Sequence, residues 1–234
     1  WLTDSTFDIT QIDVSTNNVS YYARVPFEAV VKVNFDSEKI KIIDARGKIL
    51  TPGFIDQHVH ITGGGGEGSF KTRAPEITLS KLTSGGITTV VGLLGTDGTT
   101  RSVENLVAKA KALKEEGITV FAHTGSYEYP TVTLTDSIKK DICFIEEIIG
   151  VKLALSDHRA PNVSNLELQR VASDARVAGM LSGKAGIVVL HMGDGKKGLQ
   201  PVREILEETE IPMKTIRPTH VNRREELLEE AFDY

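Results

Sequence analysis

The sequence predicts an α/β fold in which parallel strands alternate with helices, preceded by a short β-rich segment. From residue 54 onwards, six apolar, strand-like runs alternate with six helical stretches. Strands that alternate with helices in this way form parallel sheets. The strand–helix unit recurs about every 30 residues, which is the spacing of a TIM-type (β/α) barrel.

The barrel predicted for residues 51–234 is truncated. A closed barrel has eight units and about 250 residues, whereas this chain of 234 residues contains six units and stops inside the sixth helical stretch. The first and last strands of such a sheet would each expose an unpaired edge. We therefore expect either that the native chain continues past Tyr234 or that neighbouring molecules cover the gap.

The strands are predicted from β-branched and aliphatic residues bounded by glycine and polar turn residues. Residues 1–50 contain two such runs, "FEAVVKVNF" and "KIKIIDARGKIL". The six barrel strands are expected at 54–60, 87–95, 118–125, 150–157, 186–194 and 215–222. The intervening helices are expected at 74–86, 102–117, 136–150, 165–181, 201–210 and 224–232. Several of these stretches end in glycine, as helix C-termini often do.

Composition excludes several classes of protein. The net charge is −5 and no basic run occurs, which speaks against nucleic acid as the main partner. The single cysteine cannot form an intrachain disulfide and fits a reducing compartment. No run approaches the ~20 apolar residues of a membrane span, and the first ten residues do not resemble a secretory signal. We therefore expect a cytoplasmic protein with no membrane partner.

Four histidines stand at predicted strand ends. His58 and His60 close the first strand at a spacing of two residues, so both side chains point to the same face. His191 and His220 end the fifth and sixth strands. The C-terminal ends of barrel strands meet at one mouth, and imidazole nitrogens with open positions suit a catalytic Zn²⁺ or a similar ion. Although a single strand-end histidine is usually a surface residue, the four together predict a metal site.

Lys152 lies in the fourth strand run, "GVKLALSD". One interpretation is a surface amine whose stem covers apolar neighbours. The other is a buried amine, which loses its proton readily. A neutral amine can add CO₂ to give a carbamate, and this bidentate anion could bridge two metal ions about 3.5–4 Å apart.

The motifs as a set resemble the amidohydrolase superfamily with a binuclear metal centre and, within it, the isoaspartyl (β-aspartyl) dipeptidase family. The resemblance runs from about residue 44 to 234 and does not clearly extend over residues 1–43. It rests on "FIDQHVH", "GGGGE", "VVGLLGTD", "TGSY", "KLALSDHR", "HMGD" and "PTHVNR".

The resemblance implies a ligand set for two divalent metal ions, expected to be Zn²⁺. His58 and His60 would hold the first ion, His191 and His220 the second, and carboxylated Lys152 would bridge them. The family's remaining ligand and general base is an aspartate at the end of the eighth strand, which lies beyond this chain. In the family a small β-sandwich takes strands from both chain ends, so residues 1–50 are expected to form part of one.

The resemblance also implies the substrate contacts, which are Gly65, Glu67, Thr96, Tyr127, Arg159 and Arg223. Glu67 would pair with a substrate ammonium, and the two arginines would bind carboxylates in bidentate fashion. Tyr127 would donate to the developing oxyanion, so we place Tyr127 and Glu67 in the catalytic machinery. By position alone, these residues are equally compatible with a flexible surface loop, surface ion pairs and a rim aromatic.

Four further polar residues fall near strand ends without a place in the family's ligand set. His123 and His158 are expected to lie behind the ligands or to face solvent. Asp157 and Asp194 could orient neighbouring groups or could be surface carboxylates.

These features predict an enzyme, namely a metal-dependent amidohydrolase. It would cleave the isopeptide bond of small acidic β-aspartyl dipeptides by a metal-bridged hydroxide. We also expect it to form a homo-oligomer. Without a strand-eight aspartate, a chain of this length is expected to hydrolyse β-aspartyl dipeptides feebly or not at all. One alternative is another superfamily hydrolase, of the dihydroorotase or hydantoinase kind, which acts on cyclic amides. The other is a non-catalytic scaffold with an amidohydrolase-like fold.

Overall fold

The computed structural model describes residues 47, 49 and 51–234 of the chain. The chain divides into two units, residues 1–53 and residues 54–234, and the second of these is compact. The β-rich segment predicted for residues 1–50 lies outside the described residues except at Gly47 and Ile49. The second unit carries the whole strand–helix alternation.

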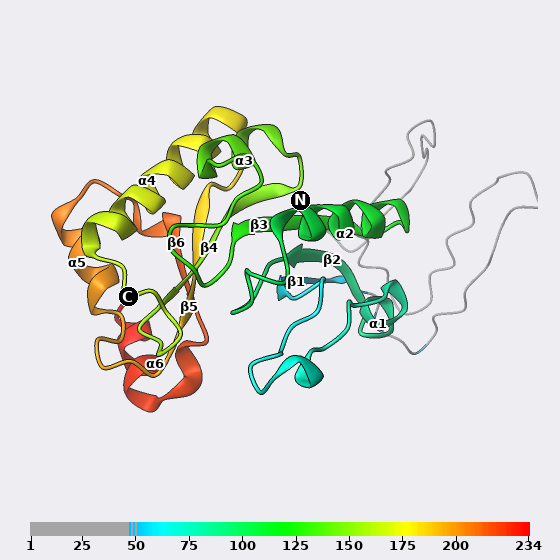
Figure 1. The fold of residues 1–234 in the computed structure, drawn as a ribbon, viewed down its shortest axis with the longest axis horizontal. Coiled ribbons are helices and arrows are strands. Elements are labelled where there is room, and N and C mark those ends of the chain that lie inside the picture. The colour runs from blue at the N-terminus through cyan, green and yellow to red at the C-terminus, as the bar shows by residue number, and fades with distance from the viewer. Residues whose placement is uncertain (1–46, 48, 50) are drawn as a thin grey trace, which may run out of the picture. The chain divides into compact units, whose positions relative to one another are not determined.

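The second unit is built on one sheet of six parallel strands that pair in sequence order. Its strands curve as in part of a barrel (Figure 1), which confirms the predicted truncated TIM-type fold. The strands are β1 (Phe54–Val59), β2 (Ile87–Gly92), β3 (Thr119–Gly125), β4 (Ile148–Leu155), β5 (Ile187–Met192) and β6 (Ile216–Thr219).

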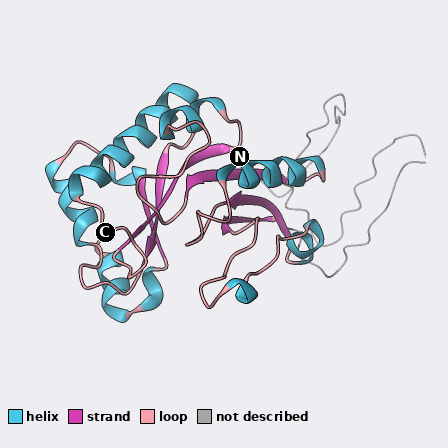
Figure 2. Cartoon of the chain, in the orientation of Figure 1, coloured by secondary structure: helices cyan, strands magenta, loops and turns pink. Residues whose placement is uncertain are grey.

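Helices connect the strands and lie along the outer side of the curved sheet (Figure 2). They are α1 (Leu79–Ser84), α2 (Val103–Glu115), α3 (Ile138–Phe144), α4 (Asn165–Ser182), α5 (Gln200–Glu208) and α6 (Glu225–Phe232), with short 3₁₀ turns η2 (Phe70–Thr72), η3 (Met213–Thr215) and η4 (Val221–Arg223). The helix α4 begins with a capping box between Ser164 and Glu167 and is followed by Gly183, whose φ of 69° is left-handed. The last helix ends at Phe232, so the expectation that the chain stops inside it was wrong.

The helix predicted at 136–150 is much shorter in the structure. The α-helix α3 ends at Phe144, and the strand β4 already begins at Ile148. Ile148 pairs with Ala122 of the neighbouring strand, and the Lys184 ammonium donates hydrogen bonds to the carbonyls of Ile142, Ile145 and Ile148. Contacts from distant segments therefore satisfy the carbonyl groups that a longer helix would have used.

The apolar core lies between the sheet and the helices. Val151, Leu153 and Leu155 of β4 are buried in it together with Leu168 of α4. Because side chains alternate across a strand, Lys152 points to the opposite, inner face. The Nζ atom of Lys152 lies 3.3 Å from the Nε2 atom of His58 on β1, so the inner face of β4 looks across the half-barrel to β1.

Candidate active site

The four strand-end histidines meet at the C-terminal mouth of the half-barrel. The ring centroids of His58 and His60 lie 5.6 Å apart, and His220 lies 4.8 Å from His58 and 4.8 Å from His191. His58 and His191 belong to β1 and β5, while His60 and His220 directly follow β1 and β6. His220 has a left-handed φ of 63°, which turns the chain back as β6 ends. The sequence-based expectation of convergence therefore agrees with the geometry.

Lys152 is completely buried among these rings. Burial lowers the pKa of its amine to about 7, because the charged ammonium loses its hydration. No carboxylate lies within ion-pair distance of Lys152 in the described part of the chain. Burial therefore favours the neutral form of this amine, and the interpretation of Lys152 as a surface amine does not hold.

The histidines are neutral at physiological pH. Burial, aided by the charge of Lys152, lowers the pKa of His58 and of His191 to about 3 and that of His60 to about 4. The pKa of His220 is lowered by the same two causes. Neutral imidazoles have a free nitrogen lone pair, which is the form that binds metal ions.

The ring nitrogens show which histidines are free to bind. The Nδ1 atoms of His58 and His60 are buried and have no hydrogen-bond partner. In His191, by contrast, Nδ1 lies 2.5 Å from the Tyr127 hydroxyl and Nε2 lies 3.1 Å from Asp157 Oδ2. His191 must therefore exchange one of these contacts before it can bind an ion.

The donor set fits the predicted pair of metal ions. It consists of neutral imidazoles, two of them with orphaned nitrogens, around an amine that burial has made available for carbamate formation. Among residues 47, 49 and 51–234, no three histidine, cysteine or carboxylate side chains surround a single point.

Tyr127 packs beside the histidines at the end of β3. Its ring centroid lies 4.3 Å from that of His191, and burial raises the pKa of its hydroxyl to about 12. The hydroxyl therefore keeps its proton throughout the neutral range and can donate a hydrogen bond. In the structure this hydroxyl faces His191, at the edge of the histidine cluster.

Glu67 and Arg159 form an ion pair in front of the histidines. The Arg159 Nη1 atom lies 2.8 Å from Glu67 Oε2, and the Thr96 hydroxyl donates to Glu67 Oε1 at 2.8 Å. The hydrogen bond from Thr96, and then those from Arg159, lower the pKa of Glu67. The three residues predicted to bind substrate thus meet one another, and substrate groups would have to replace the pairing of Glu67 with Arg159.

Asp157 links Arg159 to the histidines. It accepts hydrogen bonds from Arg159 Nε and Nη2, both at 2.8 Å, and lies against His191. The hydrogen bonds from Arg159 hold the pKa of Asp157 well below its usual range. Of the two interpretations of Asp157, the structure supports orientation of its neighbours, whereas Asp194 is exposed.

Arg223 approaches the same cluster from η4, where its Nη2 atom lies 3.4 Å from His191 Nε2. The remaining two histidines differ in their exposure. His158 is exposed, whereas His123 on β3 is 2% exposed. Of the two alternatives, solvent exposure therefore holds for His158 and is excluded for His123.

The glycine run forms part of an excursion that we call the glycine loop, residues 62–74. Gly63 and Gly65 have left-handed φ angles of 81° and 65°. A Cβ atom at Gly63 would lie 2.2 Å from the Ala74 carbonyl oxygen, and one at Gly65 would lie 2.7 Å from that of Thr72. The glycines are therefore required for close packing within the loop itself. The loop borders a small cavity of about 60 Å³ that His60, Glu67, Thr96 and Tyr127 also line.

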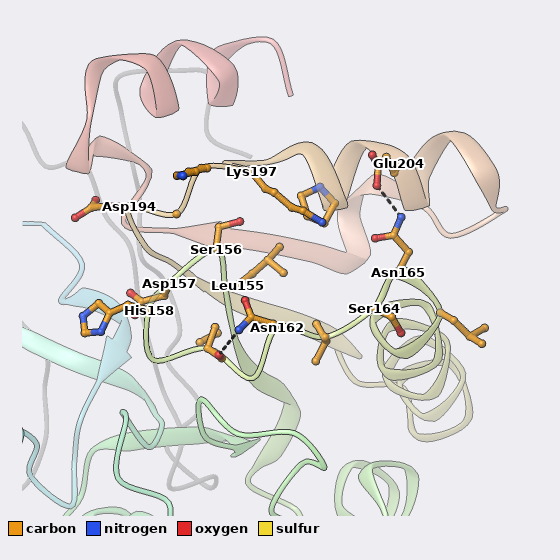
Figure 3. Close-up of a pocket in the computed structure, with 17 residues that line it drawn as sticks. Leu155, Ser156, Asp157, His158, Asn162, Ser164, Asn165, Asp194, Lys197 and Glu204 are labelled. Carbon is orange, nitrogen blue, oxygen red and sulfur yellow. Dashed lines mark hydrogen bonds between the residues drawn. The ribbon is translucent and has the colours of Figure 1, made fainter.

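A larger cavity of about 860 Å³ lies elsewhere, between the loops that follow β4 and β5. Figure 3 shows it with Asp157, His158 and Asp194 toward one end and the hydrogen-bonded pair Asn165 and Glu204 toward the other. None of the residues predicted for the metal or substrate site lines this cavity. Size alone does not make this cavity the active site, because the four histidines and the buried Lys152 converge elsewhere, at the mouth of the half-barrel.

Sequence reasoning missed Arg101, which is buried beneath the glycine loop. It stands six residues after the last residue of the motif "VVGLLG" and shows no spacing that marks it as functional.

A further finding concerns the helices. Within the described part of the chain, none is long and apolar enough to cross a membrane.

Comparison with known proteins gives one family and two kinds of relative. The amidohydrolase family model matches residues 49–212. The crystal structure of a β-aspartyl dipeptidase from Fervidobacterium islandicum AW-1 superimposes with a TM-score of 0.77 at 54% identity and covers 78% of this chain. A second structure of that dipeptidase, in complex with β-Asp-Leu, matches equally well. Dihydroorotases of Listeria monocytogenes and Bacillus cytotoxicus are 27% and 28% identical over 77% and 45% of this chain.

The chain spans 50% of the length of the solved dipeptidase structures, and 44% and 23% of the lengths of these two dihydroorotases. The family model covers well over half of the chain, and the strand-end histidines and buried lysine stand where its motifs led us to expect them. The chain therefore belongs to the amidohydrolase family.

Proposed function

We propose that the protein hydrolyses the isopeptide bond of β-aspartyl dipeptides with the help of two divalent metal ions. One observation carries the proposal. The buried Lys152 and the four histidines lie directly behind an ion pair of Glu67 and Arg159. Such a pair offers one anionic and one cationic group, as a zwitterionic acidic dipeptide requires. The 54% identity to solved β-aspartyl dipeptidases supports the same substrate class.

The amidohydrolase family generally uses divalent metal ions. His58 and His60 would hold one ion and His191 and His220 the other, with carboxylated Lys152 between them. We propose Zn²⁺ because neutral imidazole donors suit it. When bound, the ions supply Lewis acidity and lower the pKa of water.

The remaining side chains bind and orient the substrate. Glu67 would accept hydrogen bonds from the substrate ammonium once its pairing with Arg159 is exchanged. Arg159 and Arg223 would then bind the substrate carboxylates, and Gly65 would present its backbone to the dipeptide. Tyr127, which keeps its proton because burial raises its pKa to about 12, would donate to the amide oxygen as charge develops on it. Asp157 would keep Arg159 and His191 in place during this exchange.

The test is hydrolysis of β-Asp-Leu compared with α-Asp-Leu and dihydroorotate. Glu67→Gln and Arg223→Met should each lower kcat/KM for β-Asp-Leu by about one to two decades, because a charge-assisted contact is worth roughly 1.5–3 kcal/mol. Metal content, measured by mass spectrometry of the elements, should stay unchanged in both. If both variants cleave β-Asp-Leu as well as the parent, the dipeptide assignment fails.

The second candidate is hydrolysis of a cyclic amide, favoured by the curated dihydroorotases among the relatives. It keeps the metal ligands but has no ammonium for Glu67 to bind. Turnover of dihydroorotate that exceeds turnover of β-Asp-Leu and that is insensitive to Glu67→Gln would favour it. A scaffold without activity would bind no metal.

The homo-oligomeric state and the cytoplasmic location stay predictions from the sequence.

A further inference from the structure

Arg101 is one of the few charged side chains buried in the described part of the chain, with 6% of the residue exposed. It directly precedes Ser102, the residue that caps α2 by accepting a hydrogen bond from the Asn105 amide. Its backbone is therefore held at the start of a 13-residue helix. A long side chain that starts from such a fixed point can position whatever it contacts.

The Arg101 guanidinium contacts both sides of the glycine loop. Its Nε atom donates to the Thr62 carbonyl at 3.1 Å, and Nη2 donates to the carbonyls of Gly64 at 3.1 Å and Ala74 at 2.9 Å. These three acceptors are backbone groups of the two ends of the loop. One planar group thus ties together residues that are ten or more positions apart.

The same loop is closed from its other side by Asp97. Its carboxylate accepts from Arg101 Nη1 at 3.3 Å and from Arg73 Nη1 at 2.8 Å. Although burial alone would raise the pKa of Asp97, hydrogen bonds from Thr100, Thr99 and Arg73 lower it to about 2. Asp97 therefore stays charged in the neutral range and keeps both guanidinium groups in place.

Within the loop, the backbone is paired but carries little side-chain packing. The Gly66 amide donates to the Thr72 carbonyl at 3.1 Å and the Ala74 amide donates to the Gly64 carbonyl at 2.8 Å. Glu67 stands just beyond Gly66, and the glycines contribute no side chains that could anchor it. Because glycine is the most flexible residue, the loop depends on external contacts for its conformation.

We propose that Arg101 is a positioning residue, which together with Asp97 fixes the glycine loop so that Glu67 stands ready to bind the substrate ammonium. The role of Glu67 in this inference rests on the proposed function. The geometry requires an arginine, since the forked guanidinium reaches four acceptors in different directions. A lysine keeps the charge but offers one nitrogen, which cannot span Thr62, Gly64 and Ala74 together.

Steady-state kinetics on the purified, metal-loaded protein tests the proposal. Arg101→Lys should raise KM for β-Asp-Leu about ten-fold, because the contact with the ammonium is made before the chemical step, and leave kcat within about three-fold. Bound metal should stay the same. The control is Arg170→Lys, an exposed residue of α4, which should change neither constant. An unchanged KM, or a loss of kcat together with metal, would overturn the proposal.

The dependence on Glu67 separates positioning from a general structural effect. N-succinyl-leucine is β-Asp-Leu without its ammonium, so Glu67 has nothing to bind, and Arg101→Lys should change kcat/KM for it less than two-fold. In a Glu67→Gln background, Arg101→Lys should likewise add less than a two-fold loss with β-Asp-Leu. Equal losses with both substrates, or losses that multiply in the double variant, contradict a role through Glu67.

Hydrogen exchange tests the clamp without any substrate. Amides of the glycine loop, above all those of Gly66 and Ala74, should exchange faster in Arg101→Lys, while those of α4 keep their rates. Unchanged exchange in the loop would overturn the inference whatever the enzyme hydrolyses. If the parent protein cleaves dihydroorotate in preference to β-Asp-Leu but the loop amides still exchange faster in Arg101→Lys, the proposed function fails and the clamp itself stands.

Discussion

At the scale of single residues, Lys152 decides whether the metal assignment is right. It is buried with a pKa lowered to about 7, and carboxylation would turn it from a repelling cation into a shared ligand. We expect Lys152→Ala to lose both ions and activity, and short carboxylates such as propionate to restore part of each. Elemental analysis, together with carbon-13 NMR of protein exposed to labelled bicarbonate, measures this. Lys139→Ala, on the surface of α3, is the control. Full metal content in Lys152→Ala would disprove the bridge.

His123 gives a pH-dependent prediction that is independent of metal. Burial, followed by the charge of Lys152, lowers its pKa to about 3 in the folded protein, while the unfolded chain has the ordinary value of 6.5. Between these pH values only the unfolded chain binds the proton, so this residue's contribution to stability is lost as pH falls below about 6.5.

We therefore expect His123→Asn to flatten the pH dependence of the unfolding free energy. In metal-free protein between pH 6.5 and 4.5, the slope should decrease by roughly one proton, or about 1.4 kcal/mol per pH unit. Urea unfolding at several pH values gives this slope. His158→Asn, which changes an exposed histidine, should leave it unaltered. Parallel curves for His123→Asn and the parent would show that His123 does not titrate as proposed.

At the scale of elements, the connection from β3 to α3 depends on Asp141. This carboxylate is fully buried and accepts four hydrogen bonds, from the hydroxyls of Thr124 and Thr135 at 2.6 Å and from the amides of Leu134 and Thr135 at 2.9 Å. It thereby fastens the loop that carries Tyr127 to the end of β3.

Replacing Asp141 by Asn puts an NH₂ group against these donors. We expect this change to lower the free energy of unfolding by about 3 kcal/mol or more, since a hydrogen bond to a charged group contributes about 1.5–3 kcal/mol. Asp174→Asn removes a half-exposed carboxylate that pairs with Lys139 at 2.9 Å, and should cost less than about 1 kcal/mol. Denaturant titration compares the two. Equal, small losses would mean that the loop does not depend on Asp141.

At the scale of the whole described unit, the sheet has two free edges. Within residues 54–234, β1 pairs only with β2 and β6 only with β5. Phe54 and Ile55 of β1 are 65% and 64% exposed. An exposed apolar edge strand is a template for association, and a barrel removes such edges by closure.

A polypeptide of residues 1–234 is accordingly expected to self-associate. Ile55→Lys should weaken the association, because a charge on an edge strand opposes pairing. Met180→Lys, on α4, should leave it intact although Met180 is 65% exposed. Light scattering as a function of protein concentration measures the effect. A parent polypeptide that stays monomeric would show that its edges are protected.

The sequence predicted the order and type of the elements because these depend on local patterns. Apolar runs bounded by glycine set the six strands, and helical periodicity set the intervening helices. It also predicted which residues gather at the mouth, since parallel strands end on one side and His58, His191 and His220 stand at those ends. The end of α3 could not be predicted, because strand pairing and Lys184 decide it. Lys184 lies 36 or more residues away from the carbonyls to which it donates.

The side-chain pairings inside the site were decided by tertiary structure alone. Glu67 and Arg159 are 92 residues apart in sequence, and either could have faced solvent. Arg101 carries no motif, and its role follows from three carbonyls that the fold brings within reach. His123 looks like a strand-end histidine but is enclosed. Sequence patterns specify which face of an element is buried, whereas hydrogen bonds and ion pairs depend on distances of a few ångströms between segments. Only the packed fold sets those distances.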